Sequence, residues 1–253
     1  MMRLIMNVPF AAQYQKQIKE RLQGFLRSEK GNLIVTANPE MLVLCKRDPE
    51  FHDLLQSAEL VVADGTGIVI ASALLPGERI PERITGNDIL KFIFEILSEQ
   101  QGRILFLGAS KGVSHKAADK VKARYPNLHI HAIHGGKICK RGDHCWDHEE
   151  GLLEKIRAFK PQVIAVAMNF GEQEKFARYL LDQVEGSKIG VGIGGAFDFL
   201  SGNVKRAPKL VRFFGLEWLW RLIKQPSRYK RILRALIIFP LLLITDTIRS
   251  LRT

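Results

Sequence analysis

The chain has 253 residues, 46% of them hydrophobic and 25% charged, which suits one large or two small globular domains with a real core. Its three cysteines are too few and too irregularly spaced for a disulfide scaffold, so we expect a reducing, cytosolic protein. We expect no secretory leader and no membrane span, because the longest apolar run, 235–244, is half of the roughly 20 residues that a spanning helix needs.

The net charge of +12 belongs to the C-terminal part of the chain. From Gly202 onward there are twelve Lys or Arg and two acidic residues, whereas the first 201 residues carry 26 basic and 24 acidic ones. We therefore predict a near-neutral domain over 1–201, followed by a basic C-terminal appendage over 202–253.

Strands and helices alternate along the first 201 residues. Asn38-Pro39-Glu40 has the order of a helix start, with a capping side chain, a proline and an acid in the first turn. Buried strands are predicted at 33–37, 60–63, 103–107, 128–133, 163–167 and 189–193. Helices are predicted at 11–27, 39–47, 67–75, 149–159 and 172–184. Further helices are predicted to begin after Asp48-Pro49 and after the capping residue Thr85, and another is predicted to end at Tyr125. This alternation predicts an α/β fold, a Rossmann-like, mostly parallel sheet with helices on both faces.

Asp64 is the first candidate for chemistry. It ends the apolar run 60–63 and is followed by Gly65 and Gly67, which leave little side-chain bulk beside its carboxylate. Ligands of open α/β sheets bind at the carboxyl ends of the strands, where Asp64 is placed. The alternative is that Asp64 only caps the helix beginning near Gly67.

Two glycine-rich turns also follow strands. Backbone amides of 108–112, which includes Gly108 and Lys111, could hold a phosphate at a helix N-terminus, although the spacing matches no standard nucleotide fingerprint. The second turn contains Gly194 and Gly195, and Asp198 after it could accept hydrogen bonds from a ribose or a base. A plain tight turn and a helix cap are the alternatives for these two features.

Histidines and cysteines gather in one segment, which invites a zinc interpretation. The residues are His134, Cys139, His144, Cys145 and His148. Their spacing lacks the compact ligand pairs that structural zinc prefers, so we predict no metal site and expect solvated histidines.

The appendage combines basic residues, aromatic residues and the apolar run 235–244. This combination favours an amphipathic element on an anionic membrane surface. Nucleic-acid binding is the rival, but the apolar run would gain nothing against a polyanion. A third interpretation is that the aromatic side chains pack on the domain or on another subunit, as in a homo-oligomer.

Several segments together resemble the WecG/TagA/CpsF glycosyltransferases over about residues 30–234. They include Thr36-Ala37-Asn38-Pro39-Glu40, Ala63-Asp64-Gly65, the stretch 81–88, Phe106-Leu107-Gly108, Gln173-Glu174-Lys175, the stretch 194–198 and the stretch 215–219. The chain departs from the family pattern at 134–137 and at 169–172, where Glu172 reverses a charge.

The resemblance implies an inverting, metal-independent transferase without a cofactor. Members typically move N-acetylmannosamine from a UDP donor to N-acetylglucosamine on undecaprenyl diphosphate at the cytoplasmic membrane face. Asp64 would then be the general base, with Thr36, Asn38 and Arg83 in the same catalytic pocket and Gln173 near the donor or acceptor. The resemblance also implies that arginines of the appendage face the diphosphate and stabilise the leaving UDP, namely Arg206, Arg212 and Arg221. The alternatives are a nucleotide-dependent oxidoreductase and a basic nucleic-acid-binding protein.

Overall fold

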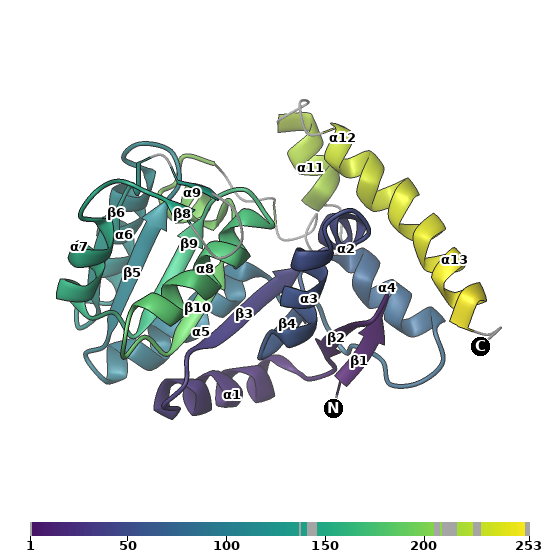
Figure 1. Cartoon of the computed structure of the whole chain (residues 1–253), viewed down its shortest axis with the longest axis horizontal. Helices are drawn as coiled ribbons and strands as arrows, with labels where there is room; N and C mark the ends of the chain where they lie inside the picture. The colour runs from purple at the N-terminus through teal and green to yellow at the C-terminus, as the bar shows by residue number, and fades with distance from the viewer. Residues whose placement is uncertain are drawn as a thin grey trace.

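The protein is described by a computed structural model covering residues 2–136, 138–140, 146–204, 208, 217–224 and 229–250. Its centre is an eight-stranded sheet in the order β1-β2-β4-β3-β10-β9-β5-β6, in which every pair except β1-β2 is parallel (Figure 1). The strands are β1 (Met2–Ile5), β2 (Val8–Ala11), β3 (Asn32–Ala37), β4 (Leu60–Ala63), β5 (Arg103–Gly108), β6 (His129–Ile133), β9 (Val163–Ala167) and β10 (Ile189–Gly192).

Helices cover both faces of the sheet. One face packs against α1 (Gln15–Arg27), α5 (Gly86–Glu99), α6 (Val113–Arg124) and α9 (Ala196–Leu200). The other packs against α2 (Pro39–Cys45), α3 (Pro49–Ser57), α4 (Thr66–Leu74), α7 (Leu152–Phe159) and α8 (Glu172–Gln183). Successive residues of a central strand therefore enter different cores: Val163 and Ala165 face one, Ile164 and Val166 the other. Burial of both strand faces explains the continuous apolar runs in the sequence.

The predicted α/β fold and its six predicted strands are confirmed, each within about two residues. The sequence prediction missed the N-terminal hairpin of β1 and β2, which adds one antiparallel edge strand. Met6 and Asn7 form its two-residue turn with φ of 51° and 63°, a left-handed conformation that asparagine tolerates. The helix predicted from residue 11 consequently begins only at Gln15.

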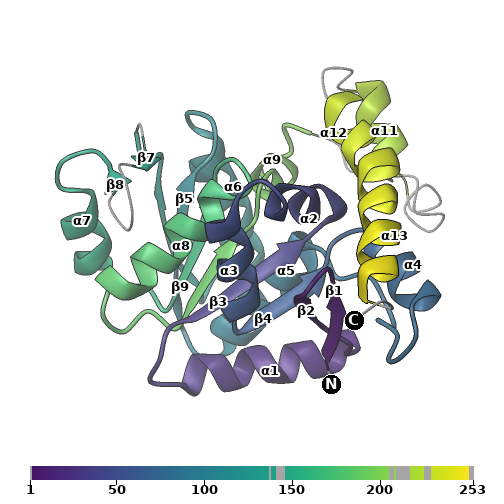
Figure 2. The same cartoon turned by 45° about the vertical axis from the view of Figure 1, so that its right-hand side comes forward.

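The C-terminal segment packs on the domain. It contains α11 (Glu217–Lys224), α12 (Tyr229–Leu233), a π-helical turn (Arg234–Ile238) and α13 (Phe239–Ser250), and its last three parts run past α2 (Figure 2). Phe239 is 2% exposed and joins the core on the α2 face. The π turn precedes Pro240, which has no N–H to donate to the helix ladder. The boundary predicted at residue 201 stays a prediction.

A short antiparallel pair, β7 (Cys139–Lys140) and β8 (Trp146–Asp147), lies outside the main sheet. Within the residues that the structure describes, none of the helices combines the length and the apolar character needed to cross a membrane.

Candidate active site

A cleft of about 720 Å³ lies at the carboxyl ends of the parallel strands, a size within the usual range of small-ligand pockets. Eight of the predicted site residues line it: Thr36, Asn38, Asp64, Gly108, Gln173, Gly194, Gly195 and Asp198. They come from five segments far apart in the sequence, at or just after the strand ends, and the parallel sheet brings them together at one edge.

The remaining predicted residues lie elsewhere or outside the described part. Among the described residues that line the cleft, neither Arg83 nor Lys111 occurs. Arg206 and Arg212 lie outside the described residues, and Arg221 belongs to α11, where only its backbone is described. Their predicted roles stay predictions.

Asp64 directly follows β4 and lies next to the start of α2. Its backbone N–H donates to the carbonyl oxygen of Ala37 at 2.8 Å, so Asp64 lies beside the end of β3. The N–H of Ile84 donates to the carbonyl oxygen of Ala63 at 2.9 Å, which brings the Arg83 backbone close to the same strand end. Helix α4 begins at Thr66, and its N-cap is Gly65. Asp64 is therefore not that helix's N-cap, contrary to the alternative interpretation.

The glycine after Asp64 is required by close packing. A Cβ on Gly65 would lie 2.7 Å from Cδ of Pro39, the first residue of α2. The side chain of Asn38 caps this helix, because its Oδ1 accepts the N–H of Met41 at 3.1 Å, as the sequence predicted. That bond fixes Asn38 at the rim of the cleft and leaves its amide NH₂ group as a donor.

Both glycine turns bend toward the cleft. Gly108 has a φ of +93°, and a Cβ there would lie 2.4 Å from the carbonyl oxygen of Ala167. Gly194 has a φ of +50°, and its N–H donates to Oε1 of Gln173 at 2.8 Å. Only glycine fits the first position without displacing β9.

Gln173 and Glu174 form a buried polar pair at the start of α8. Nε2 of Gln173 donates to Oε1 of Glu174 at 2.6 Å, and the N–H of Gly171 donates to Oε2 of Glu174 at 2.6 Å. Glu174 is fully buried, and this burial raises the pKa of its carboxyl to about 7, although both hydrogen bonds act to lower it. Because its amide is held at both ends, Gln173 presents one fixed orientation to the cleft.

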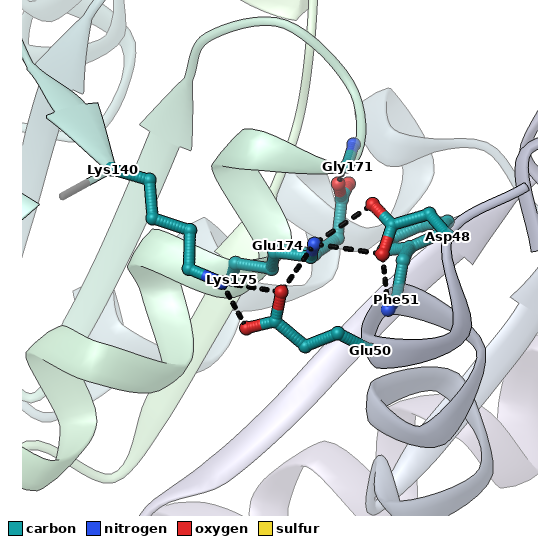
Figure 3. A network of polar contacts seen from close by, with 7 residues as sticks. All are labelled: Asp48, Glu50, Phe51, Lys140, Gly171, Glu174 and Lys175. Carbon is teal, nitrogen blue, oxygen red and sulfur yellow. Dashed lines mark hydrogen bonds and ion pairs between the residues drawn. The ribbon is translucent and has the colours of Figure 1, made fainter. Parts of the chain in front are cut away.

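The first turn of α8 is also tied to α3, as Figure 3 shows. Nζ of Lys175 lies 2.8 Å from Oδ2 of Asp48 and 2.8 Å from Oε2 of Glu50, and Lys140 also pairs with Glu50. Although burial alone would lower it, hydrogen bonds to Asp48 and Glu50 raise the pKa of Lys175. This network holds α8, and with it Gln173, against the neighbouring helix.

The cleft offers positively polarised groups to an anionic ligand, beside the carboxylates of Glu40, Asp64, Glu172 and Asp198. Helices α5 and α8 begin at the cleft, where Thr85, Gly86 and residues of 169–173 line it. Helix N-termini carry partial positive charge and backbone N–H donors. Two cationic side chains, Arg231 and Arg234, reach the cleft from the C-terminal segment. The arrangement can place a carboxylate near a nucleophile and cations near a phosphate.

Three charged residues of the cleft, Glu40, Arg231 and Arg234, were not predicted as site residues from the sequence. Glu40 was interpreted as a first-turn acid of a helix and as part of a family segment, and Arg231 and Arg234 as part of a cationic surface. The signal for Glu40 was weak, because an acid after Asn-Pro is explained by the helix start alone.

The zinc alternative gains no support. In the described part of the chain, no three His, Cys, Asp or Glu side chains gather as metal ligands would. His134 lines the cleft, and its Nδ1 accepts the N–H of Gly136 at 3.2 Å. His144 and Cys145 lie outside the described residues.

Comparison with known proteins shows the family of this chain. Residues 3–253 match the model of the glycosyl transferase WecG/TagA/CpsF family. The chain belongs to this family. It is therefore a glycosyltransferase.

Three similar relatives share one name, N-acetylglucosaminyldiphosphoundecaprenol N-acetyl-beta-D-mannosaminyltransferase. The protein of Bacillus spizizenii W23 is 34% identical over 212 residues, covering 83% of this chain and 77% of the relative. That of Bacillus subtilis 168 is 32% identical over 233 residues, covering 90% and 86%. One from Staphylococcus aureus MRSA252 is 31% identical over 230 residues, covering 90% and 87%. The glycosyltransferase thus aligns with most of each relative's length.

Proposed function

We propose that this glycosyltransferase moves N-acetylmannosamine from a UDP donor to N-acetylglucosamine carried on a polyprenyl diphosphate. The shared name of the relatives supports this acceptor and this sugar. The observation that carries the proposal is the cleft itself, which combines one strand-end carboxylate, Asp64, with the cationic groups Arg231 and Arg234.

Asp64 acts as the general base in this proposal. It takes the proton from the attacking hydroxyl of N-acetylglucosamine while the bond between the donor sugar and UDP breaks. One direct displacement inverts the configuration at the anomeric carbon. Negative charge builds up on the leaving diphosphate, where helix N-termini and arginines stabilise it without a metal ion. We further propose that Arg206, Arg212 and Arg221 contribute to this cationic environment.

We also propose that the enzyme works at the inner face of the cell membrane, where a polyprenyl acceptor resides. The supporting feature is a row of exposed apolar residues on the outer side of the C-terminal helices, with Leu233, Ile237, Leu241 and Ile244 each at least half exposed. Their spacing of four, four and three residues places them on one helical face. The L241E/I244E double variant should lose binding to anionic vesicles while remaining folded. Unchanged binding would contradict this part of the proposal.

The test of the chemistry is the Asp64→Asn variant. Asparagine keeps the size of the side chain but cannot accept the proton, so turnover should fall about 100-fold or more. The anomeric configuration of the product, read by NMR, should be opposite to that of the donor. Near wild-type turnover of folded Asp64→Asn, or retained configuration, would overturn the mechanism.

A further inference from the structure

Glu40 is a buried acid with two cationic partners from the far end of the chain. Only 6% of its side chain is exposed, yet it pairs with Nε of Arg231 at 2.7 Å and with Nη1 of Arg234 at 3.4 Å. The arginines themselves are 41% and 43% exposed. A carboxylate buried to this degree needs such partners, because an isolated buried charge is costly.

Arg231 has a second support. Its Cζ lies 5.0 Å from the centre of the Phe170 ring, within the range of a cation–π contact. Its guanidinium is thus held by Glu40 at the Nε side and by an aromatic ring. A guanidinium carries five N–H donors, and the bond to Glu40 uses one of them. Glu40, Phe170 and both arginines line the cleft.

We propose that Glu40 is a positioning residue, which holds Arg231 and Arg234 at the cleft as a preformed binding site for a substrate diphosphate. This inference rests on the proposed function, because that reaction involves two diphosphates, one in the donor and one in the acceptor. Long arginine side chains lose substantial rotamer entropy when they are ordered. Because Glu40 orders both arginines before a ligand binds, the binding free energy is not reduced by that loss of entropy.

The chain offers a matched control for a merely structural role. Nζ of Lys46 pairs with Oδ1 of Asp246 at 3.1 Å, so this ion pair also joins α2 to the C-terminal segment. Neither residue is among the described residues that line the cleft. Glu40→Gln removes a charged contact from α2 to α12 and the π turn, and Lys46→Ala removes one from the end of α2 to α13, but only the first frees cleft arginines.

The experiment measures diphosphate binding to the full-length protein by calorimetry, with UDP in one arm and a short-chain polyprenyl-diphosphate-N-acetylglucosamine in the other. We expect Glu40→Gln to weaken binding in at least one arm about tenfold, as the loss of a charged hydrogen bond would. The arm affected identifies which diphosphate the arginines bind. Lys46→Ala should stay within about twofold of wild type.

A double-mutant cycle gives the readout that a structural role would not produce. Arg231→Lys keeps the charge but loses the Nε contact, so adding Glu40→Gln to it should weaken binding by less than the product of the two single effects. Wild-type binding by Glu40→Gln in both arms, equal losses in Glu40→Gln and Lys46→Ala, or strictly multiplicative effects would each overturn the inference. Binding requires no turnover, so a wild-type protein that binds diphosphates without transferring N-acetylmannosamine would refute the proposed function and not the role of Glu40.

Discussion

The buried carboxyl of Glu174 gives a sharp thermodynamic prediction. It accepts the N–H of Gly171 and Nε2 of Gln173, each at 2.6 Å, from within the protein interior. Glu174→Gln keeps the shape but supplies only one oxygen, so one of the two donors loses its acceptor. Gln173 cannot turn its amide round to compensate, because its own Oε1 accepts the N–H of Gly194 at 2.8 Å.

The pKa shift sets the sign and size of the effect. Unfolded Glu174 loses its proton near its ordinary pKa of 4.5, whereas burial keeps the folded carboxyl protonated up to about pH 7. Wild-type stability therefore falls as pH rises from 4.5 to 7, by about 3 kcal/mol for this group. Glu174→Gln removes that decline. It loses a hydrogen bond worth roughly 1–3 kcal/mol at every pH, so it should be clearly less stable than wild type at pH 4.5 and close to it at pH 8.

The assay is urea unfolding of both proteins between pH 4.5 and 8, with the difference in free energy of unfolding followed against pH. Glu172→Gln is the control, because it removes an exposed carboxylate from the same helical turn and should keep the wild-type decline. A stability difference between wild type and Glu174→Gln that stays constant over this range would show that Glu174 does not titrate as its burial predicts.

Three further predictions concern packing and reactivity. Gly192→Ala should lower stability by about 1–3 kcal/mol in urea unfolding, because its Cβ would lie 2.4 Å from Oε1 of Glu174; a wild-type midpoint would contradict this. Phe239→Ala should lower Tm and speed proteolysis within 229–250, because Phe239 is 2% exposed in the core; no change in either would show that the C-terminal segment is not held there. Iodoacetamide at pH 8 should label exposed Cys139 but not Cys45, because burial raises the pKa of the Cys45 thiol to about 12; equal labelling by peptide mapping would contradict it.

The sheet could be predicted from the sequence because each central strand is buried on both faces. Val163–Ala167 is wholly apolar and short, and helices with capping residues follow such runs. The β1-β2 hairpin gave no comparable signal, since Met2 and Leu4 are apolar but exposed on an edge strand and Pro9 interrupts the second run. Its turn depends on Met6, a residue that rarely adopts positive φ.

The part of the cleft that is formed by residues directly after strands could be predicted from the sequence. Asp64 and Asn38 follow apolar runs directly, so their location needed only the rule for open α/β sheets. The contact of Arg231 and Arg234 with Glu40 joins residues more than 190 positions apart, and one of many basic residues in that segment cannot be singled out by its spacing. Burial of Glu174 was equally hidden, because an acid in the first turn of a helix usually faces solvent.

Acceptor-dependent UDP release is the measurement that tests the proposed transfer reaction. The full-length enzyme is incubated with a panel of UDP-sugars and a short-chain polyprenyl-diphosphate-N-acetylglucosamine, with EDTA present and Asp64→Asn in parallel. We expect release from UDP-N-acetylmannosamine that requires the acceptor, survives EDTA and is nearly abolished in Asp64→Asn. Absence of acceptor-dependent release from folded wild-type protein, or release that EDTA stops, would contradict the proposed reaction.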